Sequence, residues 1–76
     1  MVRVFSTPTC PYCVALKGFL KEHNIEFEDI DVSQNMEAQK EMIDKSGQYG
    51  VPVIDIDGEI IVGFNQDRIK QLLKLT

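Results

Sequence analysis

The chain's only two cysteines stand in the motif Cys10-Pro11-Tyr12-Cys13, and no other stretch constrains the fold as strongly. A β-like apolar run over residues 2–5 precedes the motif, and a helix-like run over residues 14–23 follows it. The pair therefore opens a helix, where unpaired N–H groups and the positive end of the helix dipole favour a thiolate. We predict that Cys10 is the attacking thiol and that Cys13, one helical turn later, is the resolving thiol.

Three other roles of the cysteine pair have to be compared with redox chemistry. Zinc takes four nitrogen or sulfur ligands, and the only further one is His23 at the far end of the helix, so a site would need a dimer. A structural disulfide that closes so short a loop constrains little of the unfolded chain. An inert core role ignores the helix start, where Pro11 loses no hydrogen bond. We favour redox chemistry and expect no metal.

Length and charge exclude several classes of protein. The 76 residues predict one domain, 1–76, with a modest core. The net charge of −4 and the absence of a basic cluster argue against nucleic acid and anionic membranes as partners. No apolar run approaches the ~20 residues of a membrane span, and Met1 leads straight into a strand pattern, so we expect no signal peptide. Two cysteines are too few for a secreted disulfide framework, which indicates the cytoplasm.

The first half of the chain alternates strand, helix and strand. After a strand over Val2–Ser6, the helix carries one apolar stripe. Its members are Leu16, Phe19, Leu20 and His23, with Ala15 beside them and Lys17, Lys21 and Glu22 off it. A second strand contains Ile25, Phe27, Ile30 and Val32. Its acidic residues, Glu26, Glu28, Asp29 and Asp31, are interpreted as a solvated flank or, alternatively, as an acidic docking face.

The second half is divided by cap and turn signals. Its elements are a helix over Met36–Ser46, strands over Val51–Ile56 and Glu59–Val62, and a last helix with Ile69, Leu72 and Leu73 inside. Asn35 and Asn65 are N-cap candidates, Gly47 ends the first of these helices, and Asp57-Gly58 is a hairpin turn. The order β-α-β-α-β-β-α predicts an α/β fold: a four-stranded mixed sheet with three helices on both faces. Its first two strands are expected to be parallel.

Pro52 is out of place at the start of a central strand unless its missing N–H has a purpose. A cis Val51–Pro52 bond that turns the backbone beside Cys10 would supply one. Only ~5–6% of X–Pro bonds in folded proteins are cis, so Pro52 alone does not establish this interpretation.

Together these residues resemble the glutaredoxins, especially the short bacterial glutaredoxin-like redoxins, over the whole chain. Cys-Pro-Tyr-Cys is the dithiol glutaredoxin motif, Val51-Pro52 matches a loop with a cis-proline, and Gly63 matches the second glycine of a Gly-Gly turn. The resemblance implies a thioredoxin fold, thiol–disulfide exchange and pairing of the Val51 backbone with the substrate. Together with the position of Pro52, it predicts a cis Val51–Pro52 bond that faces the Cys10 sulfur. Pro11 and Tyr12 are assigned to the substrate-binding surface together with Val51, Pro52 and Gly63.

Departures from the family concern glutathione. Glutaredoxins usually carry a lysine at the position of Thr7 and an aspartate at that of Gln66, and both meet the tripeptide. Gln39 does match a family position near its glycyl end. Gly50 and Val62 replace a threonine and a glycine. Each missing charge-assisted bond weakens binding by roughly 1.5–3 kcal/mol, so we predict weak glutathione binding and no tightly bound cofactor.

Gly63-Phe64 also resembles a turn of the ribonucleotide-reductase-linked redoxins, which thioredoxin reductase reduces. Asn65-Gln66 stands where that turn usually continues with Arg-Pro, so the match is partial. Phe64 is alternatively a hydrophobic plug under the last helix.

Thioredoxins carry a buried acidic residue in the first strand, six residues before the attacking cysteine. Val4 stands at that position here, so no carboxylate that could act as a base is evident.

The predicted function is a monomeric oxidoreductase that reduces protein or mixed disulfides, with a thioredoxin-reductase-type flavoenzyme or glutathione as reductant. A first alternative is a carrier in which Cys10 of two subunits and two glutathiones hold a [2Fe–2S] cluster. Pro11 and the weakened glutathione site argue against that carrier. A second is a chaperone-like module that uses the Val51-Pro52 groove, which the intact dithiol argues against.

Overall fold

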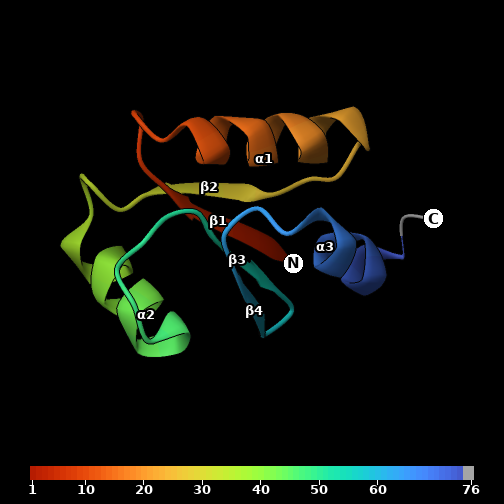
Figure 1. Ribbon diagram of the computed structural model, residues 1–76. Helices are drawn as coiled ribbons and strands as arrows, with labels where there is room; N and C mark the ends of the chain where they lie inside the picture. Colours follow the sequence, from red (N-terminus) through yellow and green to blue (C-terminus); the bar gives the residue numbers. More distant parts are fainter. Residues whose placement is uncertain (75–76) are drawn as a thin grey trace.

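In the computed structural model, which describes residues 1–74, four strands form one sheet and three helices pack against it (Figure 1). The strands are β1 (Val2–Ser6), β2 (Glu28–Asp31), β3 (Val53–Ile56) and β4 (Glu59–Val62), and the helices are α1 (Pro11–Glu22), α2 (Met36–Ser46) and α3 (Gln66–Leu73). The strand order is β2-β1-β3-β4. β1 is parallel to β2 and antiparallel to β3, and β4 is antiparallel to β3. The predicted mixed α/β sheet is confirmed.

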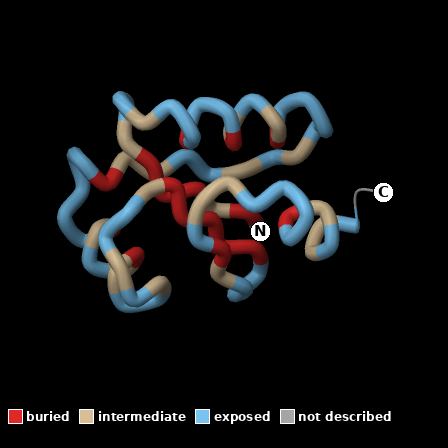
Figure 2. Tube along the Cα trace, viewed as in Figure 1, coloured by how far each residue is buried: buried red, intermediate tan, exposed pale blue. Residues whose placement is uncertain are grey.

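Helices cover both faces of the sheet, as predicted. Side chains alternate along β1, so Val2 and Val4 join one core cluster and Phe5 joins another. The first cluster includes Leu16 and Leu20 of α1 and Ile69 of α3, and the second includes Ala38 and Met42 of α2. Buried residues concentrate along the strands between these helices (Figure 2). The central strands β1 and β3 therefore form a rigid base for the loops at their ends.

The predicted caps define α2 and α3. Asn35 Oδ1 accepts a hydrogen bond from the Ala38 N–H at 3.0 Å, and Asn65 Oδ1 accepts one from the Arg68 N–H at 3.1 Å. Gly47 ends α2 with a φ of 74°, a conformation that glycine adopts without a steric penalty. Both helices therefore begin where the sequence predicts.

The hairpin between β3 and β4 turns at Asp57 and Gly58, whose φ angles of 51° and 95° are typical of a two-residue turn with the twist of the strands. β3 begins at Val53 rather than at the predicted Val51, because Pro52 has no N–H to pair with a neighbouring strand. The paired part of β3 therefore starts directly after the predicted substrate loop.

α1 begins at Pro11, the residue that the sequence predicts at the first helical position, and the preceding cysteine caps it. The second strand differs from its predicted extent. β2 is shorter, because only four of its residues pair with β1, and Ile25 and Phe27 pack against the core before it. Ala15 and His23 are exposed, although the stripe prediction placed them with the core. Three buried neighbours already fill the inner face of α1, and His23 lies beyond its last turn.

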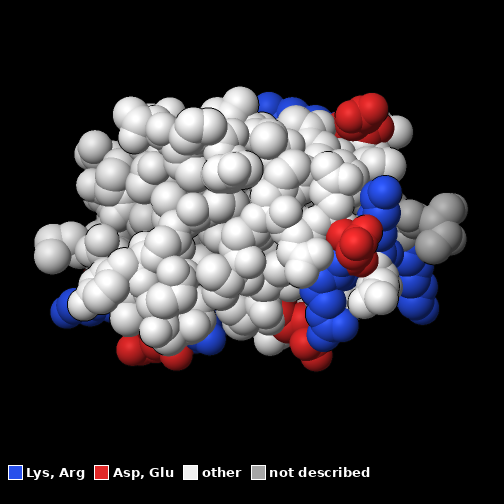
Figure 3. Space-filling view, viewed as in Figure 1, with Lys and Arg blue, Asp and Glu red and all other residues white. Residues whose placement is uncertain are grey.

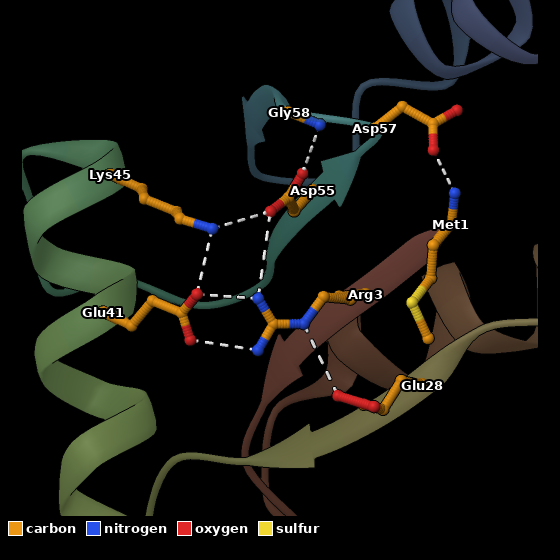
Figure 4. A network of polar contacts seen from close by, with 8 residues as sticks. All are labelled: Met1, Arg3, Glu28, Glu41, Lys45, Asp55, Asp57 and Gly58. Carbon is orange, nitrogen blue, oxygen red and sulfur yellow. Dashed lines mark hydrogen bonds and ion pairs between the residues drawn. The ribbon is translucent and has the colours of Figure 1, made fainter.

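A polar network joins β1, α2 and β3 on the α2 side of the sheet (Figure 4). The Arg3 guanidinium donates to both Glu41 carboxylate oxygens, at 2.7 and 3.0 Å. Lys45 donates at 3.0 Å to Asp55, which is only 5% exposed and also accepts from the Gly58 N–H. Because Glu41 and Lys45 of α2 are bound to Arg3 of β1 and Asp55 of β3, the network fixes α2 relative to the sheet.

Membrane insertion through a helix is not indicated: within residues 1–74, no helix has both the length and the apolar character to cross a bilayer.

Candidate functional site

The two cysteines lie where β1 passes into α1. Cys10 is the N-cap of α1, Pro11 occupies the first helical turn, and Cys13 follows one turn later. The two sulfur atoms are at disulfide distance, with the Cα atoms 5.2 Å apart, and the Cys13 N–H donates to Cys10 Sγ at 3.1 Å. The N-cap position gives Cys10 the free N–H groups and helix dipole on which the sequence argument rests.

Exposure distinguishes the two sulfurs. Cys13 is fully buried at 0% exposure, whereas Cys10 is half-buried and follows the exposed Thr9. Pro11 and Tyr12, between them, are exposed, Tyr12 by 69%. An approaching disulfide therefore meets Cys10 before Cys13.

The loop before β3 lies against Cys10. The Val51–Pro52 bond is cis, and the Val51 carbonyl oxygen is 3.8 Å from Cys10 Sγ. The prediction of a cis bond beside the Cys10 sulfur is therefore confirmed. Pro52 is buried, and its carbonyl accepts from the Gly63 N–H at 2.8 Å. Gly63, with a φ of 82°, therefore joins the turn after β4 to the same loop.

Other predicted site residues have different local roles. The Thr7 carbonyl accepts from the Cys10 N–H at 3.4 Å, within the loop that carries Cys10. Phe64 is half-buried and packs against the first core cluster, edge-on to Phe19 at 5.7 Å, as the plug interpretation expects. Asn65 caps α3. The half-buried Gln39, in the first turn of α2, and the exposed Gln66, at the start of α3, have no side-chain hydrogen bond among the described residues.

Three segments that meet at Cys10 carry no charged residues. Residues 4–16, 46–54 and 60–66 contain none of the chain's eight Lys and Arg or twelve Asp and Glu residues. The contacts of Val51 with Cys10 and of Pro52 with Gly63 join these three segments, and we call their exposed surface the uncharged face. In Figure 3 the start of α1, the loop before β3 and the β4–α3 connection form a white face, with charges along its lower margin and over α3. Tyr49, 77% exposed, belongs to the second segment, and motif analysis missed it.

A polar recess lies behind the loop that carries Cys10. It has a volume of about 280 Å³ and is lined by Ser6, Thr7, Pro8, Lys17, Asp29 and Asp31. Lys17 Nζ lies 3.1 Å from Asp29 Oδ2 and 3.5 Å from Ser6 Oγ, and Ser6 Oγ donates to Asp29 Oδ1 at 3.1 Å. Sequence analysis placed Lys17 off the apolar stripe and did not predict this cluster.

Within residues 1–74, no group of three His, Cys, Asp or Glu side chains is arranged to bind a metal ion. His23 stacks on Phe19 at the far end of α1, with ring centroids 4.5 Å apart.

A sheet of this order with a redox-active cysteine pair at the start of α1 defines a thioredoxin-fold thiol–disulfide redox protein. A family model described as Glutaredoxin matches residues 2–61, and the chain belongs to the glutaredoxin family.

Individual proteins agree with this assignment. The chain is 50% identical to an uncharacterised glutaredoxin-like 8.6 kDa protein of a rubredoxin operon in Clostridium pasteurianum, over 97% of this chain and 99% of the relative. It is 36% identical to glutaredoxin 3 of Escherichia coli K12, over 82% and 75% of the two chains. The crystal structure of the thioredoxin-like protein BC3987 superposes with a TM-score of 0.89 at 35% identity and covers 95% of this chain and 99% of its own. The predicted thioredoxin fold is thereby confirmed.

Proposed function

We propose that this protein is a dithiol electron carrier that reduces disulfides in protein partners. The Cys10 thiolate attacks one sulfur of the substrate disulfide, that bond breaks, and the second substrate sulfur leaves as a thiolate and takes up a proton. Cys13 then loses its proton and attacks Cys10, the mixed disulfide breaks, and the second substrate thiol is released. A reductant returns the resulting Cys10–Cys13 disulfide to the dithiol.

The position of the sulfurs carries the proposal. A half-exposed Cys10 caps a helix while a fully buried Cys13 lies one turn behind it, so each sulfur suits one step only. The helix terminus supports thiolate at Cys10, and burial keeps Cys13 from competing for the substrate.

The uncharged face supports a protein substrate. An extended segment that carries a disulfide would place its backbone beside Val51, whose carbonyl is already next to Cys10. Exposed Tyr12 and Tyr49 offer large apolar contact area at a low cost in side-chain entropy. A partner that docks there needs no complementary charges.

The surroundings of Thr7 support a poor fit for glutathione. Thr7 has no charge, and the recess beside it contains two carboxylates, Asp29 and Asp31, against one ammonium, Lys17. Lys17, the cation that lines this recess within residues 1–74, is already paired with Asp29 and is not free to bind a tripeptide carboxylate. We therefore propose a thioredoxin-reductase-type flavoenzyme as the main reductant, acting on a monomer in the cytoplasm.

A two-arm assay tests the proposal. One arm supplies NADPH, glutathione and glutathione reductase, and the other supplies NADPH and thioredoxin reductase, with the same disulfide-bearing protein as substrate. The proposal expects faster NADPH consumption in the second arm. Equal or faster turnover with glutathione contradicts the choice of reductant, and no turnover in either arm contradicts the function. A visible chromophore in protein purified without oxygen would favour the iron–sulfur alternative.

A further inference from the structure

Lys17 differs from the other charged residues of α1 in how far its side chain is exposed. The helix buries Cys13, Leu16 and Leu20, and its other charged residues, Lys21 and Glu22, are exposed. The Lys17 side chain is only partly exposed. Removing an ammonium from water is unfavourable unless it gains partners, so its contacts are expected to matter.

Its partners come from two strands. Asp29 of β2 forms an ion pair with Lys17. Ser6, at the end of β1, is only 2% exposed, and its hydroxyl donates a hydrogen bond to Asp29. The three side chains form a closed triangle of contacts. We call them the Ser6–Lys17–Asp29 cluster. It is tied to the position at which β1 enters the loop that carries Cys10.

The cluster is also aligned with the resolving cysteine. Lys17 follows Cys13 by four residues, and residues four apart lie on the same face of a helix, about 6 Å along its axis. A positive charge there favours the Cys13 thiolate, and the Asp29 carboxylate opposes it. The other charged group in the recess is Asp31 of β2, while Ser6, Thr7 and Pro8 contribute none.

We propose that Lys17 and Asp29, held together by Ser6, are positioning residues that set the thiolate content of Cys13 and so the rate of the resolving step. The inference rests on the proposed roles of Cys10 and Cys13. In that step the Cys13 thiolate attacks Cys10, the Cys10–substrate bond breaks, the Cys10–Cys13 bond forms, and the substrate thiolate takes up a proton.

The two charges predict opposite effects, which a general loss of structure does not produce. In a Cys10→Ser background, where Cys13 is the only thiol, thiolate absorbance is titrated against pH. Lys17→Met is expected to raise the pKa of Cys13 by about half a unit and Asp29→Asn to lower it by a similar amount, as a screened charge at this range would. Lys17→Arg is expected to keep the original value. Lys21→Met, one turn further along α1, is the matched control and is expected to leave it unchanged.

A second readout uses the protein with both cysteines. At neutral pH the lifetime of the mixed disulfide, measured by rapid acid quench and mass spectrometry, is expected to lengthen about threefold in Lys17→Met and to shorten in Asp29→Asn. Shifts in the same direction, or none, overturn the inference. The Asp29→Asn arm is decisive even if Lys17→Met does not fold, because an unchanged or raised pKa there contradicts the proposal. These outcomes leave the proposed function intact, whereas failure of the unaltered protein to reduce any disulfide refutes that function.

Discussion

The Sγ atom of Cys10 lies 3.8 Å from the carbonyl oxygen of Val51, a residue 41 positions away in the sequence. Pairing of β1 with β3 brings these loops together, because Phe5 and Val53 are opposite each other at the ends of the two strands. The proposed nucleophile, Cys10, and the backbone that would hold a substrate segment are thus fixed by the central sheet. Precise placement of reacting groups by rigid elements is what such exchange requires.

Unequal exposure of the sulfurs predicts unequal reactivity. In the reduced protein, Cys10 is expected to react with iodoacetamide at a pH below the free-thiol range, since thiolates at such helix starts have pKa values of roughly 3.5–7.5. Cys13 is expected to stay unmodified until the protein unfolds. Mass spectrometry of peptides after a pH series measures both. Modification of Cys13 first, or a Cys10 pKa near that of a free thiol, would refute the argument from the helix terminus.

The uncharged face predicts a selective effect of Tyr49. Tyr49→Ser is expected to lower kcat/KM for a protein disulfide about fivefold, as loss of roughly 1 kcal/mol of docking would, while a small-molecule disulfide is reduced at nearly the original rate. Gln71→Ala, an exposed change on α3, is the control. Added salt is expected to have little effect on the protein substrate. Equal loss with both substrates would assign Tyr49 a structural role instead.

The network on the α2 side predicts a specific dependence of stability on acid. Hydrogen bonds from Arg3 and then Lys45 lower the pKa of Glu41 from 4.5 to about 2. Between these values the unfolded chain binds the proton more readily, so the Glu41 contribution is complete above about pH 4.5 and is lost as the pH falls toward 2. Urea unfolding across this range is expected to show that the free energy of unfolding depends less on pH in Glu41→Gln than in the unaltered protein.

Glu37→Gln, an exposed change in the first turn of the same helix, serves as the control and is expected to follow the unaltered protein. If Glu41→Gln loses stability with acid as steeply as that protein does, Glu41 does not contribute as the network suggests.

Burial raises the pKa of Asp55, but hydrogen bonds from Lys45 and Gly58 outweigh it, so that pKa is also lowered. Asp55→Ala is expected to cost about 1–3 kcal/mol of stability at neutral pH, since it leaves those donors without their acceptor.

Restoring two charges is expected to create glutathione dependence. The double variant Thr7→Lys, Gln66→Asp supplies the cation and the carboxylate that the family places at these positions. Two charge-assisted bonds of about 1.5 kcal/mol each correspond to roughly 100-fold in binding. Glutathione-dependent turnover is expected to rise while reduction by thioredoxin reductase is retained. If the unaltered protein already turns over with glutathione as fast as the variant, the two positions do not limit glutathione use.

Local signals predicted much of the fold. Asn35 and Gly47 fixed both ends of α2, and Asp57-Gly58 fixed the hairpin, because each of these residues satisfies a backbone requirement within a few positions. The cis Val51–Pro52 bond was also predicted, but only with help from the family resemblance.

Contacts that depend on strand register could not be predicted. The acidic residues of β2 were interpreted as a uniform flank, yet Asp29 pairs with Lys17 of α1 while Glu28 contacts Arg3 of β1. Which carboxylate meets which cation follows from the parallel pairing of β1 with β2. Buried Asp55 was also missed, because its partner Lys45 lies on α2 and their contact depends on how that helix packs against the sheet.

Trapping of the mixed disulfide tests the assignment of Cys10 as the attacking thiol. Reduced Cys13→Ser is mixed with a disulfide-bearing protein, and its intact mass is measured before and after dithiothreitol. We expect a covalent adduct through Cys10 that dithiothreitol removes, and no adduct with Cys10→Ser under the same conditions. An adduct formed by Cys10→Ser alone, or by neither variant, would contradict the assignment of Cys10 as the attacking thiol.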